Sequence, residues 1–239
     1  MDDRLPVLVL AVALVVALGV GVLWRTLVGG PSETFVVHAG APHVIGGYGD
    51  HFAYNGEGVR RLGGTAELRV DRPRSTGTLH VTVETTEESG SLRLSVDETL
   101  TGRISLSTKL DPSSPLTWFE DVFGDSGRGG PDLPQTRAVV TGTGRFRLSV
   151  DGREIASALF GEWAVVQATR REDGAIRRSG LLYSPLLRDK TGFVDPERKE
   201  LILIVRSDHT DPANRPPYGR VLHLVFDDVT LPEDETAAR

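Results

Sequence analysis

Short runs in which apolar and polar residues alternate recur along the chain after the Gly-Gly-Pro sequence at 29–31. Alternation with a period of two places apolar side chains on one face and polar side chains on the other, which is typical of half-buried β-strands. No long run with helical periodicity competes with them. The clearest runs are 65–71, 77–84, 91–97, 103–107 and 144–151, and further strands are expected at 34–38, 162–171, 176–182, 200–206 and 220–226.

The residues between these runs favour tight turns. Asp151-Gly152 and Asp173-Gly174 each lie between two β-like runs, and Asp-Gly supplies the positive φ angles of a short hairpin. Many short strands without βαβ alternation favour an antiparallel sandwich over a parallel α/β fold. We therefore predict a mainly β chain in which an N-terminal helix precedes one antiparallel β-sandwich, jelly-roll-like, over 34–228. The pentapeptide Arg-Leu-Ser-Val-Asp occurs at 93–97 and 147–151. Two strands that acquired the same residues independently explain this repeat as well as a duplicated structural unit does.

A long connection rich in proline and glycine, 111–136, interrupts the strand pattern. It holds one expected short helix, with Ser114 as its N-cap and Pro115 at its first position. We expect this helix to pack over an open end of the sandwich, and a functional lid is the alternative. The apolar residues that would share one helical face are Leu116, Phe119, Val122 and Phe123.

Residues 5–24 form an uncharged, apolar segment between Arg4 and Arg25. Twenty residues suffice for a helix to cross the roughly 30 Å hydrocarbon layer of a bilayer. A cleaved signal peptide is the alternative, but its apolar stretch is usually shorter and ends in a small-residue cleavage pattern that is missing here. We predict an uncleaved transmembrane helix in the cell membrane.

The basic residues that flank the helix are nearly balanced, so they do not decide its orientation. We therefore base the expected orientation on the four-residue head, 1–4, which we expect to remain in the cytoplasm. The linker 25–33, the β domain and a flexible acidic tail, 229–239, then lie outside the cytoplasm. This single-pass arrangement makes the lipid bilayer, through 5–24, the first expected partner.

Composition limits the kinds of partner, besides the bilayer, that the chain is expected to bind. The chain has 27 basic and 33 acidic residues and a net charge of −6, which argues against non-specific binding to nucleic acid or anionic lipid. It has no cysteine, which excludes disulfides, thiolate zinc sites, a cysteine nucleophile and a lipidated cysteine anchor. An envelope polymer or a membrane protein remains as a partner.

A glycine-rich segment carries the first candidate site. If 48–54 is extended, Tyr48, Asp50, Phe52 and Tyr54 project from one face. Aromatic rings beside a carboxylate suit a sugar ring, so we predict that Tyr48, Phe52 and Tyr54 bind a ligand. The alternative is that these aromatic residues enter the core. No Lys-Ser/Thr follows the glycines, which disfavours a phosphate-binding loop.

Two Asp-His pairs form the second candidate site. Asp50-His51 and Asp208-His209 both lie near predicted strand ends, and Asp211 follows the second pair. Loops cluster at the ends of a sandwich, so these carboxylates and imidazoles could converge on a divalent metal ion. Solvated turns are the alternative. His80 is expected to be exposed on its strand, and His223 is expected to be buried between Val221 and Val225.

The string at 124–131, Gly-Asp-Ser-Gly-Arg-Gly-Gly-Pro, resembles the nucleophile signature of chymotrypsin-like serine proteases. That resemblance implies Ser126 as nucleophile, with His51 or His80 as base and Asp97 as its orienting carboxylate. Arg128 interrupts the glycine pattern, and a Gly/Ser/Asp loop is also typical of any flexible connection. The protease hypothesis is therefore disfavoured.

These observations favour a membrane-anchored, non-catalytic β-sandwich that binds a ligand, polymer or protein of the cell envelope. Two other classes remain open. One is an anchored hydrolase that acts on glycans through loop carboxylates, and the other handles metal ions through the Asp-His loops.

Overall fold

The computed structural model describes residues 34–49, 58–110, 113, 116–123, 135–170, 194–214 and 216–232. The chain divides into two compact units, Met1–Thr34 and Phe35–Arg239, and the fold below is that of the second. Its long strands are β1 (Thr34–Gly47), β3 (Gly63–Asp71), β4 (Thr76–Glu84), β7 (Arg103–Leu110), β10 (Gln135–Val150), β11 (Arg153–Ala168), β12 (Asp195–Arg206) and β13 (Val221–Thr230). The short strands are β2 (Arg60–Arg61), β5 (Leu92–Arg93), β6 (Thr99–Leu100), β8 (Thr117–Trp118) and β9 (Asp121–Phe123).

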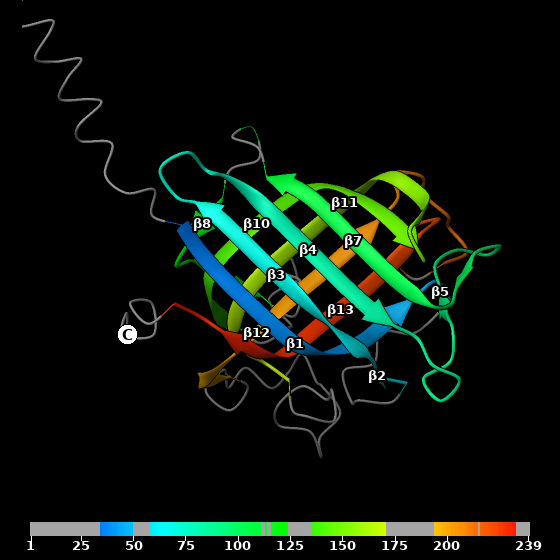
Figure 1. The fold of residues 1–239 in the computed structure, drawn as a ribbon, viewed down its shortest axis with the longest axis horizontal. Helices are drawn as coiled ribbons and strands as arrows, with labels where there is room; N and C mark the ends of the chain where they lie inside the picture. Colours follow the sequence, from blue (N-terminus) through cyan, green and yellow to red (C-terminus); the bar gives the residue numbers. More distant parts are fainter. Residues whose placement is uncertain are drawn as a thin grey trace, which may run out of the picture. The chain divides into compact units, whose positions relative to one another are not determined.

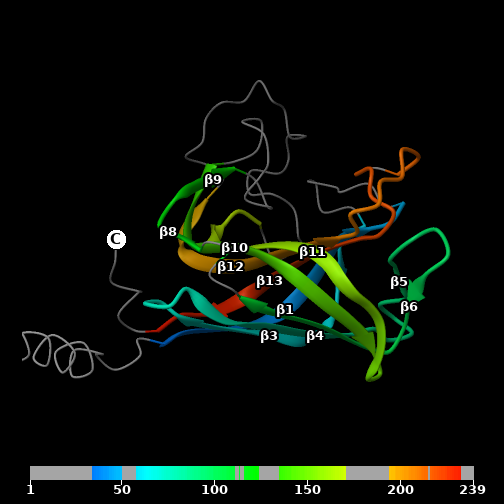
Figure 2. The same ribbon diagram turned by 90° about the horizontal axis from the view of Figure 1, so that it is seen from above.

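The eight long strands form one closed antiparallel barrel. Their order around the barrel is their order along the chain, β1-β3-β4-β7-β10-β11-β12-β13, and β13 pairs with β1 to complete the ring. Figures 1 and 2 show the strands tilted around a common axis. The predicted jelly-roll-like sandwich is therefore wrong, because alternating strands satisfy a single closed sheet as well as two packed sheets.

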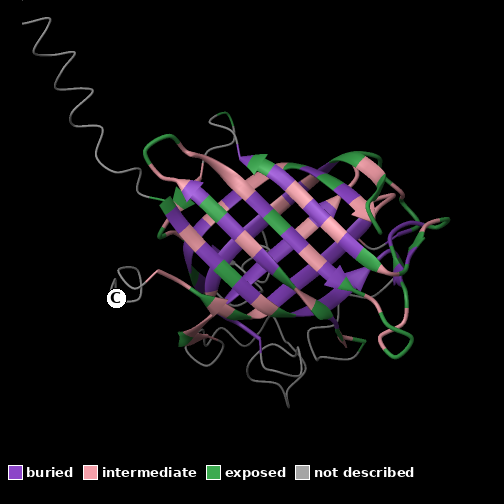
Figure 3. Cartoon of the chain, viewed as in Figure 1, coloured by how far each residue is buried: buried purple, intermediate pink, exposed green. Residues whose placement is uncertain are grey.

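The alternation predicted from the sequence is the alternation between barrel interior and outer surface. In β4, Leu79, Val81 and Val83 are buried, whereas His80 and Glu84 are exposed. Figure 3 shows this as a regular change of burial along strands such as β3 and β4, whereas β13 is buried without a break from Val221 to Phe226. Apolar side chains from all eight long strands join one core cluster, with Phe146, Trp163 and Phe226 among its largest members. An eight-stranded barrel is just narrow enough for side chains to fill, and this interior is packed in that way.

Glycines make room for two of the aromatic side chains. Gly142 lies directly opposite Trp163 in the β10–β11 ladder, and a Cβ on Gly142 would lie 2.5 Å from Cζ2 of Trp163. A Cβ on Gly161 would overlap the ring of Phe146. The large rings therefore occupy the space above residues that have no side chain.

The Asp151-Gly152 turn joins β10 to β11 as the sequence predicts. Asp151 has a φ of 48° and Gly152 has a φ of 81°, the combination that a two-residue type I′ hairpin requires. The Asp151 carboxylate also accepts the Arg103 N–H at 3.0 Å. Asp173-Gly174 and the strand expected at 176–182 lie outside the described residues.

A hairpin covers one end of the barrel. The strand expected at 91–97 is limited to β5, which pairs with β6 as a separate two-stranded sheet. Leu92, Leu94 and Leu100 are buried in the barrel's core cluster. Figures 1 and 2 place this hairpin and β8 at opposite ends of the barrel.

The helix expected near Leu116 is also wrong, because residues 116–123 contain β8 and β9, both paired with β10. Trp118 packs edge-on against Phe35, with ring centroids 5.1 Å apart, and the Arg72 guanidinium lies 4.3 Å from the Trp118 ring. Phe119 has a φ of 53°, which no right-handed helix accommodates. The expected cap, Ser114, and Pro115 lie outside the described residues.

Within the residues that the structure describes, no helix is long and apolar enough to cross a membrane. The segment 5–24 lies outside these residues, so the transmembrane helix stays a prediction.

The fit between Gly161 and Phe146 generates a stability prediction. Gly161→Ala should lower the free energy of unfolding by about 1–3 kcal/mol, because the new methyl group overpacks the interior. Gly63→Ala is the matched control, since a Cβ added there would have no other atom within 4 Å, and it should change stability by less than about 0.5 kcal/mol. Urea denaturation measures both, and equal effects would contradict the packing described here.

Candidate functional site

A pocket of about 510 Å³ opens on the outer wall of the barrel. It crosses neighbouring strands, since β12 pairs with β13, β13 with β1, and β1 with β2. Its size lies within the range of about 300–1,000 Å³ that small-molecule sites occupy. The residues that line it are Ala41, Pro42, His43, Arg61, Leu62, Arg198, Asp227 and Asp228; we call it the seam pocket, because it lies where β13 closes the barrel onto β1.

The β1 backbone is unusual where it lines the seam pocket. Ala41 has a φ of 48°, a left-handed conformation that residues with a Cβ rarely adopt. Its neighbours Gly40 and Pro42 stay paired with Asp228 and Phe226. Strained residues of this kind persist where the surrounding structure holds them, and they cluster at functional sites.

A histidine–aspartate pair joins the two strands at this point. Nδ1 of His43 lies 3.0 Å from Oδ2 of Asp227, and their side chains are only 3% and 11% exposed. A carboxylate that holds one ring nitrogen fixes the orientation of the imidazole and leaves Nε2 for another partner. The pair therefore gives the seam pocket a rigid polar wall.

The seam pocket also holds charges of both signs that do not neutralise each other. Arg198 is half-buried and Asp228 is exposed, and both line the pocket. Neither side chain makes an ion pair or a side-chain hydrogen bond within the described part of the chain. A guanidinium supplies a planar set of donors for a carboxylate or phosphate, and an aspartate accepts from cations and hydroxyls.

Tyr48, the first predicted ligand residue, contacts two side chains from distant parts of the chain. Its side chain is 9% exposed, its hydroxyl donates to the Asp211 carboxylate, and the Arg93 guanidinium lies 5.4 Å from its ring. This hydrogen bond raises the pKa of the Tyr48 hydroxyl and, with the N–H of Ala213, lowers the pKa of Asp211. Phe52 and Tyr54 lie outside the described residues, so a site that they share with Tyr48 stays a prediction.

Two of the predicted metal residues that the structure describes, Asp208 and Asp211, have side-chain partners in an ion pair or a hydrogen bond, and none is found within the described ranges for the imidazole of the third, His209. Asp208 forms an ion pair with Arg145 at 2.6 Å, and Asp211 binds Tyr48. The described residues contain no group of three or more His, Asp or Glu side chains that could hold a metal ion. Asp50 and His51 lie outside these residues, so a metal site that includes them stays a prediction.

Sequence reasoning did not find the seam pocket. Its charged residues come from segments far apart in the chain, and only the barrel topology brings them together. One local signal was present, since two adjacent carboxylates, Asp227-Asp228, follow the run 221–226, in which only His223 is polar.

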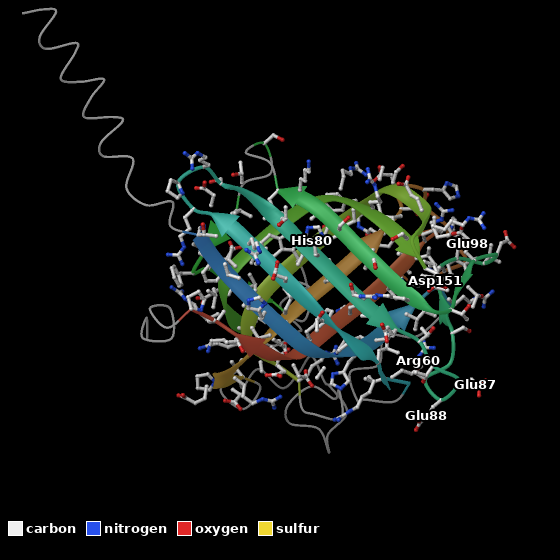
Figure 4. The ribbon with its side chains drawn as sticks, in the orientation of Figure 1. Arg60, His80, Glu87, Glu88, Glu98 and Asp151 are labelled. Carbon is white, nitrogen blue, oxygen red and sulfur yellow. The ribbon has the colours of Figure 1, made fainter. Side chains whose placement is uncertain are left out.

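Buried polar groups also occur outside the pocket. Glu200 is 1% exposed, and its carboxylate accepts the hydroxyl of Thr169 at 2.6 Å, the N–H of Thr169 at 3.0 Å and the N–H of Arg170 at 3.3 Å. Burial nevertheless raises the pKa of Glu200. His223 is buried and His80 is exposed, as their positions in the strands predict; Figure 4 shows His80 on the outer face of β4.

Comparison with known proteins finds no match to this chain among family models, curated proteins or solved structures. The function must therefore be argued from the geometry of the site.

The buried carboxyl of Glu200 generates a pH prediction. Because its folded pKa is raised above the ordinary 4.5, its contribution to stability is complete below about pH 4.5 and is lost as the pH rises through the folded pKa. The Glu200→Gln variant has no titratable group at this position. The parent's free energy of unfolding should therefore fall relative to that of Glu200→Gln as the pH rises above 4.5.

Urea denaturation between about pH 4 and pH 8 measures this difference. Val166→Ala, at the residue paired with Glu200 in the β11–β12 ladder, is the control, because it loosens packing without removing a titratable group. Its difference from the parent should not follow the pH. A flat difference for Glu200→Gln as well would contradict the raised pKa.

Proposed function

We propose that this chain is a non-catalytic binding module whose ligand occupies the seam pocket. The observation that carries the proposal is that Arg198 and Asp228 line one pocket without a partner among the described residues. Charged side chains in a concave site, left available to a ligand, are the usual polar determinants of small-molecule recognition.

The packed interior supports a site on the outer wall. Many closed barrels hold a ligand inside, but here apolar side chains from every long strand form one buried cluster. A ligand is therefore better accommodated between β1, β2, β12 and β13, where the pocket opens.

The framework around the pocket suits binding. His43, Arg198 and Asp227 lie on strands of the closed sheet, and sites on regular elements hold their geometry better than sites on loops. The described lining contains no Ser, Thr, Cys or Lys, and therefore no hydroxyl, thiol or amine nucleophile.

The sequence adds a location to this proposal. The apolar segment 5–24 would anchor the chain in the cell membrane, and the linker 25–33 would connect the anchor to β1. The barrel would then present the seam pocket to ligands outside the cytoplasm, as a tethered binding module of the cell envelope.

A ligand screen tests the site. Full-length protein in detergent micelles is titrated with small charged compounds, such as amino acids, dicarboxylates, diamines and uronic acids, while backbone amide shifts are followed by NMR. We expect the shifts to concentrate on His43, Leu62, Arg198, Asp227 and Asp228. Hits whose shifts map elsewhere on the barrel, or the absence of any hit, would overturn the proposal.

Arg198→Gln sharpens the test. Loss of a charge-assisted hydrogen bond should weaken carboxylate-bearing hits by about tenfold or more. Arg153→Gln is the matched control, because Arg153 is an exposed arginine beside the Asp151-Gly152 turn. It removes the same charge and should leave the affinity within about twofold of the parent. Equal losses in both variants would indicate a general charge effect and contradict a site at Arg198.

A further inference from the structure

The seam pocket is lined by side chains of opposite charge that do not form an ion pair with each other. Arg198 and Asp228 are not paired with each other or with any other described side chain. Arg61 adds a second guanidinium to the lining, and Asp227 is held by His43. The pocket thus offers one cationic region and one anionic region to the same ligand.

A ligand with a single charge does not fit this arrangement well. An anion drawn to Arg198 would be repelled by Asp228, and a cation drawn to Asp228 would be repelled by the two arginines. A ligand that carries both charges satisfies each region without leaving either side chain against a like charge. Such matching also discriminates against ligands that lack one of the two groups.

Apolar residues complete the lining. Pro42 is buried and Leu62 is 8% exposed, and Ala41 lies beside them. They offer a small apolar surface in the same pocket, which suits an aliphatic side chain.

From these observations we infer that the ligand is a zwitterion of the amino-acid type, a free amino acid or a short peptide with both termini unblocked. Its carboxylate would bind Arg198, its ammonium group would bind Asp228, and its side chain would contact the apolar residues. This inference rests on the proposed function, because it names the ligand class of the same pocket.

A second pocket favours a peptide over a single amino acid. Arg61 also lines a neighbouring pocket of about 370 Å³ with Arg60, Thr86, Glu88 and Ser89, so the two pockets meet at its side chain. Figure 4 shows Arg60 and Glu88 at the same corner of the barrel. A peptide adds about 3.3–3.6 Å of length per residue, so a chain that outgrows the seam pocket would extend toward the polar residues that share Arg61 with it.

Blocked peptides test the inference. Full-length protein in detergent micelles is titrated calorimetrically with L-Ala-L-Ala, with its N-acetyl derivative and with its C-terminal amide. Acetylation removes the ammonium charge and amidation removes the carboxylate charge, while the rest of the peptide is unchanged. We expect the unblocked dipeptide to bind about tenfold or more tightly than either derivative.

Two variants assign each charge to its side chain. In Asp228→Asn, the loss of affinity on acetylation should largely disappear, while the loss on amidation remains. In Arg198→Gln, the loss on amidation should shrink, while the loss on acetylation remains. A variant that merely destabilised the fold would weaken all three peptides together, so this crossed pattern is specific to the proposed contacts.

The outcomes separate this inference from the proposed function. If blocked and unblocked peptides bind equally, or if no peptide binds, the zwitterion is wrong. The proposed function then still stands when other charged compounds shift the amides of the seam pocket, and it fails when none does. Preference for the unblocked dipeptide without the crossed pattern would also overturn the assignment of Arg198 and Asp228.

Discussion

The pairing of β13 with β1 is the interaction on which the rest of this structure depends. It runs from His38 and Thr230 to Gly47 and Leu222, and it joins the two ends of a sheet whose other neighbours are consecutive in the chain. Without it, both strands would present unpaired backbone groups, which is costly and promotes association with other chains. With it, the sheet has no edge, and its apolar face becomes a closed interior.

The same seam builds the candidate site. His43 on β1 and Asp227 on β13 face each other across this pair of strands, and the strained backbone at Ala41 lies beside them. Apolar side chains fill the interior, and the pocket is lined instead by residues around the seam. Fold and proposed function therefore share one constraint: the strands that close the barrel also position the residues that would hold a ligand.

The sequence predicts the elements of this fold better than their arrangement. Alternation identifies β3 and β4 to within two residues and the first five residues of β7, but the same alternation fits a sandwich and a barrel. Arg-Leu-Ser-Val-Asp at 147–151 ends β10, whereas the copy at 93–97 begins in β5 and continues through a turn. Identical residues differ here because their long-range partners differ, and local sequence does not encode those partners.

The site was less predictable than the fold. Tyr48 is predicted as a ligand residue from its neighbours in sequence, whereas its hydrogen bond to Asp211, far along the chain, could not be predicted from them. Arg198 and Asp228 have no motif around them, and their shared pocket exists only because β12, β13 and β1 are adjacent. The short strand β8 shows the same effect, since Trp118 and Phe35 meet only in the closed barrel.

Amide hydrogen exchange, followed residue by residue, tests the central claim most directly. If β1 and β13 close the barrel, their paired amides should be as protected as those of β4 and β7, because they become accessible only through global unfolding. The pairs to compare are Val44–Leu224 and Val81–Leu106. Fast exchange along β1 and β13, with β4 and β7 still protected, would show an open sheet and contradict both the closed barrel and the pocket built on its seam.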